Sequence, residues 1–345
     1  MKWQMVQLQQ IASEEKGSIV SGPFGSNISA KYFVDEGIPV IRGNNLTKGV
    51  QKFIDDGFVY LTETKAAEFR NCIAIKDDIV FTAVGSIGQV GVIPDNTKFE
   101  KYVISNKQLR VRIDKKKADP MFVYYWLSCP RMTGYLEGMN NGGAVPLLNL
   151  GIIRRVPVPL PPVDTQASIG AVISNFNDSI DNNRRRIRLL EESARLLFRE
   201  WFVYFRFPGP EKVKIVDGVP EGWGKEHLSK LVTTQYGYTE TASQQEIGPK
   251  FLRGTDINKT SYIDWASVPY CPNEKLDFRK YSLSRGDILI IRMADPGKVG
   301  IVEAEIEAIF ASYLVRLKVV NKSISSYYLF YSLLDDKYQG FIIGS

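Results

Sequence analysis

The sequence predicts an α+β protein in which two similar mixed α/β domains are joined by a long coiled-coil-type helix. Three observations predict this fold class. Apolar residues recur in alternating steps of four and three between Asp164 and Trp201, which is the heptad pattern of a helix that packs lengthwise against another helix. A proline-rich segment, residues 156–162, leads into this pattern. The segments on either side of the helix, 1–160 and 208–345, share one order of strands, turns and a helix.

The first predicted domain, residues 1–160, consists of short strands and loops. Short apolar runs end in turns that are rich in Gly, Asn and Asp, as is typical of strands and hairpins. In chain order, the expected elements are a strand or short helix at 5–11, a loop at 21–26, a strand and polar turn at 37–46, a strand at 77–82, a glycine-rich hairpin at 85–91, a strand at 108–113 and a helix at 120–127.

The linking segment, residues 161–207, contains the proline entry and the long helix. Asp164 is expected to be the N-cap because it follows two prolines, which cannot lie inside a helix, and Pro208 stops the chain beyond the other end. At 1.5 Å per residue the helix would be roughly 55 to 60 Å long. The alternative is a long core helix of one large domain. The residues expected to form its packing seam are Ile173, Phe176, Ile180, Asn183, Ile187, Leu190, Leu197 and Trp201.

The second predicted domain, residues 208–345, repeats the order of the first. Its turn at 250–257 matches the one at 39–46, and its glycine-containing segment 295–302 matches 86–93. Three further matches, in the first apolar segment, in one strand and in the aromatic helix, occur in the same order. Five ordered matches indicate two copies of one domain.

Composition and charge exclude several classes of protein. No apolar run approaches the roughly 20 residues that cross a bilayer, and the N-terminus lacks the apolar core of a signal peptide. Three isolated cysteines and one histidine have no metal-ligand spacing, so we expect no metal, no disulfide and a cytoplasmic location. The formal net charge of +6 suits a polyanionic partner.

A search for catalytic motifs finds no active site. There is no phosphate-binding Gly-Lys-Ser/Thr run, and no Asn-Pro-Pro-aromatic run for base methylation. Glu14 to Lys16 have a nuclease-like spacing without the preceding Pro-Asp, and His227 has no catalytic context. The glycines of residues 85–91 fit a hairpin better than a nucleotide loop, because no helix pattern follows them.

Polar side chains occupy corresponding turns in both predicted domains. Arg, Asn and Gln form bidentate hydrogen bonds with base edges, whereas the competing interpretation is that such residues simply stabilise turns. The residues that we expect to contact DNA are Ser26, Arg42, Asn44, Asn45, Ser86, Gln89, Lys107, Arg253, Thr255, Arg292 and Lys298.

Four segments resemble the DNA-specificity subunit of type I restriction-modification systems. They are Gly-Pro-Phe-Gly-Ser at 22–26, Ile-Arg-Gly-Asn-Asn at 41–45, the proline entry at 156–162 with Gln166, and Leu-Phe-Arg-Glu-Trp-Phe at 197–202. The resemblance covers essentially the whole chain, and its most specific part is the proline entry with the helix that follows.

The resemblance implies a non-catalytic subunit with two target-recognition domains, each reading one half of a bipartite site on double-stranded DNA. The helix between them would fix the unread spacer and dock methyltransferase subunits, two of them in our expectation, with restriction subunits in the full complex. S-adenosylmethionine would be bound by the methyltransferase subunit, so no cofactor is expected in this chain.

Two departures from the family pattern qualify this expectation. Val163 to Thr165 stand where acidic residues are usual before the glutamine. The second copy stops at Ser345 without counterparts of residues 142–146, of the proline entry or of a second long helix. We therefore expect that either the chain is truncated or another chain supplies the helix that pairs with the exposed seam. Two other classes stay open: a fused methyltransferase or nuclease with unrecognised motifs, and a protein-interaction scaffold.

Overall fold

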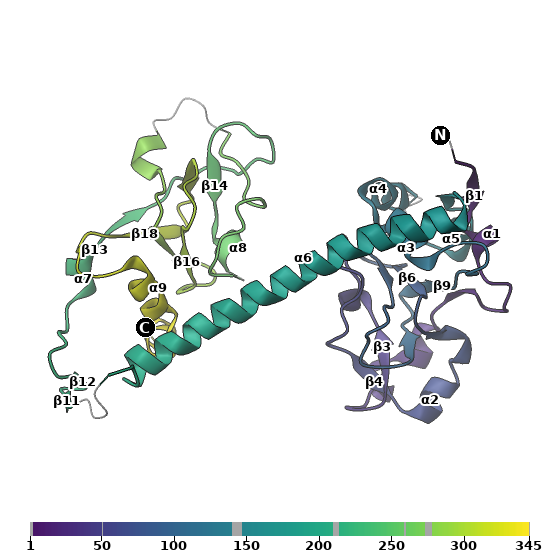
Figure 1. Ribbon diagram of the computed structural model, residues 1–345, viewed down its shortest axis with the longest axis horizontal. Coiled ribbons are helices and arrows are strands. Elements are labelled where there is room, and N and C mark those ends of the chain that lie inside the picture. The colour runs from purple at the N-terminus through teal and green to yellow at the C-terminus, as the bar shows by residue number, and fades with distance from the viewer. Residues whose placement is uncertain are drawn as a thin grey trace. The chain divides into compact units, whose positions relative to one another are not determined.

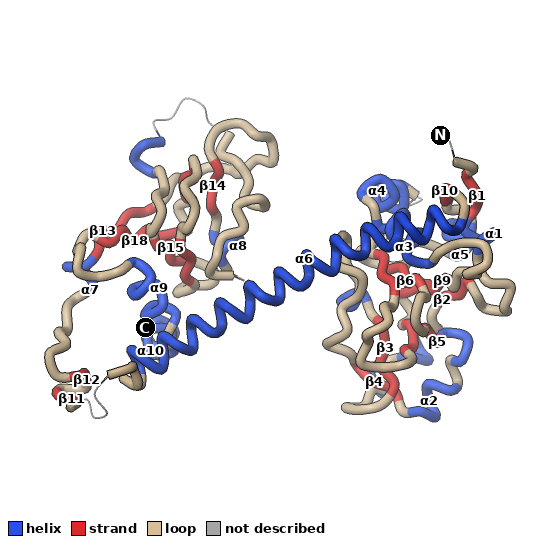
Figure 2. The backbone as a smooth tube through the Cα atoms, viewed as in Figure 1, coloured by secondary structure: helices blue, strands red, loops and turns tan. Residues whose placement is uncertain are grey.

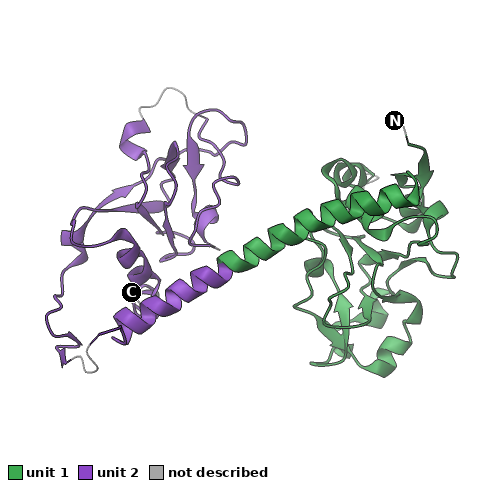
Figure 3. Ribbon diagram, in the orientation of Figure 1, with its two compact units in different colours: residues 1–187 green, residues 188–345 purple. Residues whose placement is uncertain are grey.

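The computed structural model describes residues 3–49, 51–139, 147–209, 214–258, 260–272 and 278–344. The chain divides into two compact units, residues 1–187 and 188–345, which are coloured separately in Figure 3. Both units mix helices with small sheets, as Figures 1 and 2 show, and the expected α+β fold class is confirmed. The motif at 142–146 lies outside the described residues.

The first sheet of unit 1 is antiparallel and has the strand order β2-β9-β6-β7. Its strands are β2 (Ile19–Ser21), β6 (Ile79–Thr82), β7 (Val90–Val92) and β9 (Gln108–Val111). Helix α3 (Pro120–Ser128) covers β7, and it starts where the Asp119 carboxylate accepts a hydrogen bond from the backbone N–H of Phe122 at 2.7 Å. Because β6, β7 and β9 are buried throughout, their sequences are continuously apolar or contain paired polar groups.

A second sheet in unit 1 has the order β4-β3-β8-β5, with a parallel pair at its centre. Its strands are β3 (Ile38–Ile41), β4 (Val59–Leu61), β5 (Ile73–Ala74) and β8 (Tyr102–Ile104). Strand β1 (Met5–Gln7) pairs with β10 (Pro157–Pro159), so the predicted proline entry is an extended strand beside the start of the chain. The remaining helices are α1 (Leu8–Ile11), α2 (Glu63–Ala67), α4 (Pro130–Gly138) and α5 (Leu150–Arg154).

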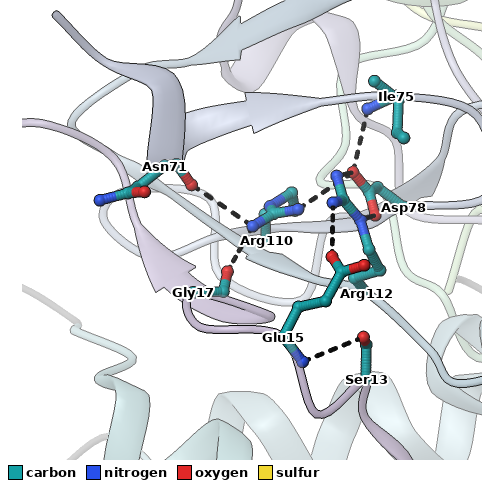
Figure 4. A network of polar contacts seen from close by, with 8 residues as sticks. All are labelled: Ser13, Glu15, Gly17, Asn71, Ile75, Asp78, Arg110 and Arg112. Carbon is teal, nitrogen blue, oxygen red and sulfur yellow. Dashed lines mark hydrogen bonds and ion pairs between the residues drawn. The ribbon is translucent and has the colours of Figure 1, made fainter.

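A buried charge network holds β6 and β9 together in unit 1 (Figure 4). Asp78 is 1% exposed and accepts hydrogen bonds from Arg112 Nε and Nη2, both at 2.8 Å, and from Arg110 Nη1 at 3.3 Å. Arg110 is 3% exposed and also donates to the carbonyls of Gly17 and Asn71. These partners compensate charges that would otherwise be costly to bury, and only Arg110 Nε in this network is buried without a hydrogen-bond partner among the described residues.

Unit 2 repeats the first sheet of unit 1 with the order β13-β18-β15-β16. Its strands are β13 (Val232–Tyr236), β15 (Ile288–Ile291), β16 (Val299–Ile301) and β18 (Leu314–Val319). The register pairs Arg316 with Leu289, as Arg110 pairs with Val80, so the two arginines correspond. This correspondence confirms the internal repeat. The other elements are α7 (Leu228–Leu231), α8 (Gly254–Ile257), α9 (Ser326–Leu334), α10 (Asp336–Gly344), the parallel pair β14 (Lys250–Leu252) and β17 (Ala308–Phe310), and the hairpin β11 (Ile215–Val216) and β12 (Val219–Pro220).

The predicted long helix is present as α6 (Val163–Phe198), followed by a π-helical turn at Arg199–Val203 (Figure 2). Since the helix starts at Val163, the assignment of Asp164 as N-cap was wrong. Asp164 lies in the first helical turn, where its charge still favours the positive end of the helix dipole. Trp201, the predicted end of the seam, belongs to the π-helical turn.

The face of α6 that packs on unit 1 shares only Ile173 with the predicted packing seam. Gln166, Gly170 and Asn177 are its buried residues, and Gln166 donates to the carbonyl of Pro161 at 2.7 Å and accepts from the N–H of Asp119. At the other end, Phe198 is buried against the rings of Tyr328 and Tyr331 within unit 2.

Most of the predicted seam is exposed to solvent. Phe176 is 69% exposed and Leu190 68%, whereas Ile173 is partly buried against the core of unit 1. The other seam residues that are exposed are Ile180, Asn183, Ile187 and Leu197. An apolar stripe therefore runs along the helix without a partner among the described residues.

Two further properties concern the part of the chain that the structure describes. None of its helices is both long and apolar enough to cross a lipid bilayer. Of the three cysteines, Cys72 and Cys271 are buried and Cys129 is partly buried.

Candidate nucleic-acid interface

Four turns of unit 1 meet at one end of the first sheet, and we call them the turn edge of unit 1: residues 22–26, 42–45, 83–89 and 105–107. Backbone hydrogen bonds join them. Gly22 N donates to Gln108 O at 3.0 Å, and Ala83 N donates to Lys107 O at 2.7 Å. The Gln89 side chain links turn 83–89 to the chain after turn 42–45, since its Nε2 donates to Leu46 O at 3.0 Å. All seven DNA-contact residues predicted for the first domain lie on this edge.

Asn45 has a structural role in turn 42–45. Its side chain is 0% exposed, its Oδ1 accepts from Arg42 N at 2.9 Å, and its Nδ2 donates to the carbonyls of Ile54 and Asp56 at 3.0 and 2.8 Å. All of its hydrogen-bonding groups are used, so Asn45 is removed from the set of proposed DNA contacts.

Arg42 lies in the same turn and is half-buried. Its Nε is buried without a hydrogen-bond partner, and its guanidinium makes no ion pair with any described residue. Because Nε is shielded from solvent, an acceptor from outside the chain would reach Arg42 through its two terminal nitrogens, which make no hydrogen bond to a described residue. Arg42 is therefore the strongest candidate contact that the sequence singled out in unit 1.

The remaining predicted residues of this edge fall into two groups. Gln89 accepts from Thr82 Oγ1 at 2.9 Å in addition to its bond to Leu46, and Asn44 Nδ2 donates to Gly57 O at 3.2 Å. These two amides hold the edge together and have limited capacity left. By contrast, Ser26, Ser86 and Lys107 are exposed, and their side chains make no hydrogen bond to another described residue.

The equivalent turn edge of unit 2 comprises residues 237–240, 253–256, 292–298 and 311–313. Here the half-buried Arg253 is held by Asp256, with Nε to Oδ2 at 3.2 Å and Nη2 to Oδ1 at 2.8 Å. Arg292 donates from Nε to Ser312 O at 2.8 Å and lies over the Tyr236 ring at 4.9 Å from its centroid. Both predicted arginines are thus already paired.

Thr255 and Lys298, the other two predicted contacts of unit 2, are exposed at this edge. A cavity of about 370 Å³ is lined in part by Thr255. Its floor includes Phe251 and Ile291, which are buried core residues. Polar rim residues that sequence reasoning did not select include Glu240 and Asp295.

Sequence reasoning also missed Phe24. Its side chain is 85% exposed on the turn edge of unit 1. The available signal was an aromatic residue between Pro23 and Gly25 in a loop, a place where no core contact is expected. Within the described ranges, no group of three or more His, Cys, Asp or Glu residues could hold a metal ion.

Residues 1–192 match the family model of the type I restriction modification DNA specificity domain. Since this match covers more than half of the 345 residues, the chain belongs to that family.

Two relatives from Methanocaldococcus jannaschii are named type I restriction enzyme specificity subunits. MjaIX is 27% identical over 67% of this chain, and MjaVIII is 23% identical over 70%. The chain matches only 52% and 58% of the length of these relatives. A solved type I restriction-modification S subunit from M. genitalium is similar in fold, with a TM-score of 0.56 and 12% identity over all of this chain and 80% of that one.

Proposed function

We propose that this chain is the DNA-specificity subunit of a type I restriction-modification complex, or a large part of one, and has no catalytic site of its own. The observation that carries the proposal is the family match over residues 1–192. In the proposal, each unit reads one half of a bipartite site on double-stranded DNA with its turn edge.

Specific reading requires side chains that reach base edges, and Arg42 meets this requirement best, because it is only half-buried and its terminal nitrogens are unpaired among the described residues. Exposed cations such as Lys107 and Lys298 suit phosphate contacts, which position a protein on DNA without selecting a sequence. The turn edges of the two units differ in most side chains, which supports two different half-sites.

The proposed partners are methyltransferase subunits, two in number, and restriction subunits in the full complex. The exposed seam of α6 would pair with a second long helix, supplied by another chain or by a further part of the same polypeptide. S-adenosylmethionine would be bound by the methyltransferase subunit, and the complex would work in the cytoplasm.

Methylome sequencing tests the proposal. The source organism is sequenced with the gene intact, deleted, and restored as the Arg42→Ala variant. We expect one bipartite methylated motif to vanish on deletion and to be reduced or relaxed in one half in the variant. An unchanged set of motifs after deletion would refute the proposal, and so would methylation by the purified chain alone.

A second experiment tests the helix as a spacer. Seven residues continuing the heptad are inserted between Ile173 and Leu197, which lengthens a helix by about 10 Å. We expect the unread spacer of the motif to grow by about three base pairs, at roughly 3.4 Å per pair. An active variant with an unchanged spacer would contradict this part of the proposal.

A further inference from the structure

Phe24 is an apolar side chain held in solvent by a rigid loop. Every other phenylalanine in residues 3–160 is buried or half-buried, whereas Phe24 is 85% exposed. Burying a phenylalanine is favourable by about 1.5–3 kcal/mol, and in the described chain this gain is not realised. An isolated exposed apolar residue is common, so the surroundings of Phe24 decide its meaning.

The backbone around Phe24 is fixed at both ends. Gly22 packs so closely on the neighbouring turn, residues 105–107, that a Cβ at this position would lie 1.8 Å from Ser105 O. On the other side, the carbonyl of Phe24 accepts a hydrogen bond from Asn27 N at 2.8 Å. Ile28, which is 5% exposed, anchors the following 3-10 helix in the core. The loop therefore holds Phe24 at a defined place rather than letting it fold back onto the surface.

That place is on the turn edge of unit 1. The loop containing Phe24 is bonded through Gly22 to the turn that carries the exposed Lys107. Ser26 lies two residues further along the same loop. Apart from Phe24, the exposed side chains of these two turns are polar or basic, which suits contact with DNA better than contact with an apolar protein surface.

The repeat shows that the fold does not require this phenylalanine. The strand registers align Ser21 with Tyr236, and two closely packed glycines, Gly22 and Gly237, follow them. Two residues further on, Thr239 stands where unit 1 has Phe24. The loop keeps its close glycine contact with either side chain, so the fold of this loop does not depend on a phenylalanine at this position.

We propose that Phe24 is a specificity-determining residue that contacts the 5-methyl group of a thymine in the major groove of the first half-site. This inference rests on the proposed function. Among the four base pairs, the thymine methyl is the one apolar group that the major-groove edge offers, and phenylalanine is a suitable partner for it. Arg42 and Ser26, on the same edge, would make the neighbouring polar contacts.

The experiment uses the full chain assembled with its methyltransferase subunits and the motif found by methylome sequencing. Each thymine of the first half-site is replaced in turn by deoxyuridine, which lacks only the 5-methyl group. Binding is measured by competition at one fixed salt concentration, because phosphate contacts make affinity depend on salt. The variants are Phe24→Ala and Phe24→Leu, with Ile75→Ala as an exposed apolar control at the opposite end of β6.

For the unaltered chain, we expect uracil at one thymine position to weaken binding by about three- to tenfold. Phe24→Ala weakens binding to the thymine site and no longer distinguishes uracil from thymine at that position, whereas Phe24→Leu and Ile75→Ala keep the distinction. Hydrogen exchange of β2 and β9 checks that the variants are folded.

The proposal is overturned if Phe24→Ala binds like the unaltered chain, if it still distinguishes uracil at every position, or if it loses assembly with the methyltransferase instead. Absence of any specific binding by the unaltered complex would be a different failure, namely that of the proposed function.

Discussion

The turn at 42–45 in unit 1 and the turn at 253–256 in unit 2 have the same capping arrangement and differ in the capping side chain. In both, the side chain of the last residue of the turn accepts a hydrogen bond from the backbone N–H of the arginine. Arg42 N lies 2.9 Å from Asn45 Oδ1, and Arg253 N lies 2.7 Å from Asp256 Oδ2. The aspartate also binds the guanidinium of Arg253, whereas the asparagine turns its amide to two carbonyls and leaves Arg42 Nε unpaired. One carboxylate therefore decides whether the arginine of the turn is available.

A second pair of corresponding sites differs in the number of ion pairs that the buried carboxylate makes. Asp78 is shared by Arg110 and Arg112 in unit 1. Its counterpart Asp287 has Arg316 at 3.5 Å, and the carbonyl of Ser282 takes a closer hydrogen bond from the same guanidinium. Burial raises the pKa of Asp287, although Arg316 opposes this shift. The stability of unit 1 therefore depends more on Asp78 than the stability of unit 2 depends on Asp287.

The largest effect that we predict tests this second difference. Asp78→Ala leaves Arg110, which is 3% exposed, without its carboxylate, and loss of one partner of a buried pair costs about 3–5 kcal/mol. Asp287→Ala should cost about 1–3 kcal/mol, because Arg316 keeps its bonds to Ser282 and Gln235. Hydrogen exchange of β9 and β18 in the full chain measures each unit separately.

The matched controls for this prediction are Asp78→Asn and Asp287→Asn, which keep an acceptor for the backbone N–H groups of Ile75 and Ser284. The asparagine variants should lose less free energy of unfolding than the alanine variants. Equal losses of protection in β9 and β18 would contradict the claim that the two networks differ.

The next effect concerns the two turns. Arg42→Ala should weaken specific DNA binding by the assembled complex about ten- to hundredfold, the range of about 1–3 kcal/mol for one bidentate base contact. Arg253→Ala should change binding less, since Asp256 already occupies that guanidinium. Competition binding at fixed salt measures both, and Arg42→Lys separates charge from the bidentate geometry. If Arg253→Ala weakens binding as much as Arg42→Ala, pairing within the turn does not control availability.

The sequence predicts the parts of this comparison that depend on local signals. The glycines of 85–91 predict the hairpin, and β6 and β7 do pair in that way. Ordered matches between 1–160 and 208–345 predict the repeat, and the heptads predict α6. By contrast, the parallel pairing of β3 with β8 joins segments about sixty residues apart, which no local pattern encodes.

The same limit explains the corrections. Asn45 and Asn44 are adjacent residues of one turn, and only the packing around them buries the first and exposes the second. The buried residues of α6 on unit 1 are Gln166, Gly170 and Asn177, none of which contributes to a hydrophobic pattern; of the predicted seam, only Ile173 packs there. Phe24 was overlooked because apolar residues were read as core.

A smaller effect is expected when the turn of unit 2 is made like that of unit 1. Asp256→Asn keeps an acceptor for the N–H of Arg253 and removes the carboxylate that holds its guanidinium. We expect DNA binding to strengthen about two- to fivefold, which is the lower part of the range of about 0.5–1.5 kcal/mol for one net hydrogen bond. The control Glu240→Gln removes a negative charge from the same edge without freeing an arginine. An equal gain in both variants would assign the effect to net charge alone.

The smallest predicted effect tests whether the backbones of the two hairpin turns are the same. Gly85 has φ +95° and its counterpart Ala294 has φ +71°, a region that costs a residue with a Cβ roughly 1–2 kcal/mol. No heavy atom lies within 4 Å of a Cβ built on Gly85, so Gly85→Ala should destabilise unit 1 through backbone strain alone, by about 1 kcal/mol. Ala294→Gly should change unit 2 little or stabilise it slightly, because relief of strain is offset by greater freedom of the unfolded chain.

Hydrogen exchange of β6 and β15 measures the effect of each substitution on the stability of its unit. If Gly85→Ala has no effect, the turn of unit 1 relaxes when it is given a Cβ, and the equivalence of the two hairpins extends only to their strands. If Ala294→Gly destabilises unit 2 instead, the methyl group contributes packing that outweighs its strain. Ala294 lines the cavity on the turn edge of unit 2, so that result would identify the wall of this cavity as the source of the packing.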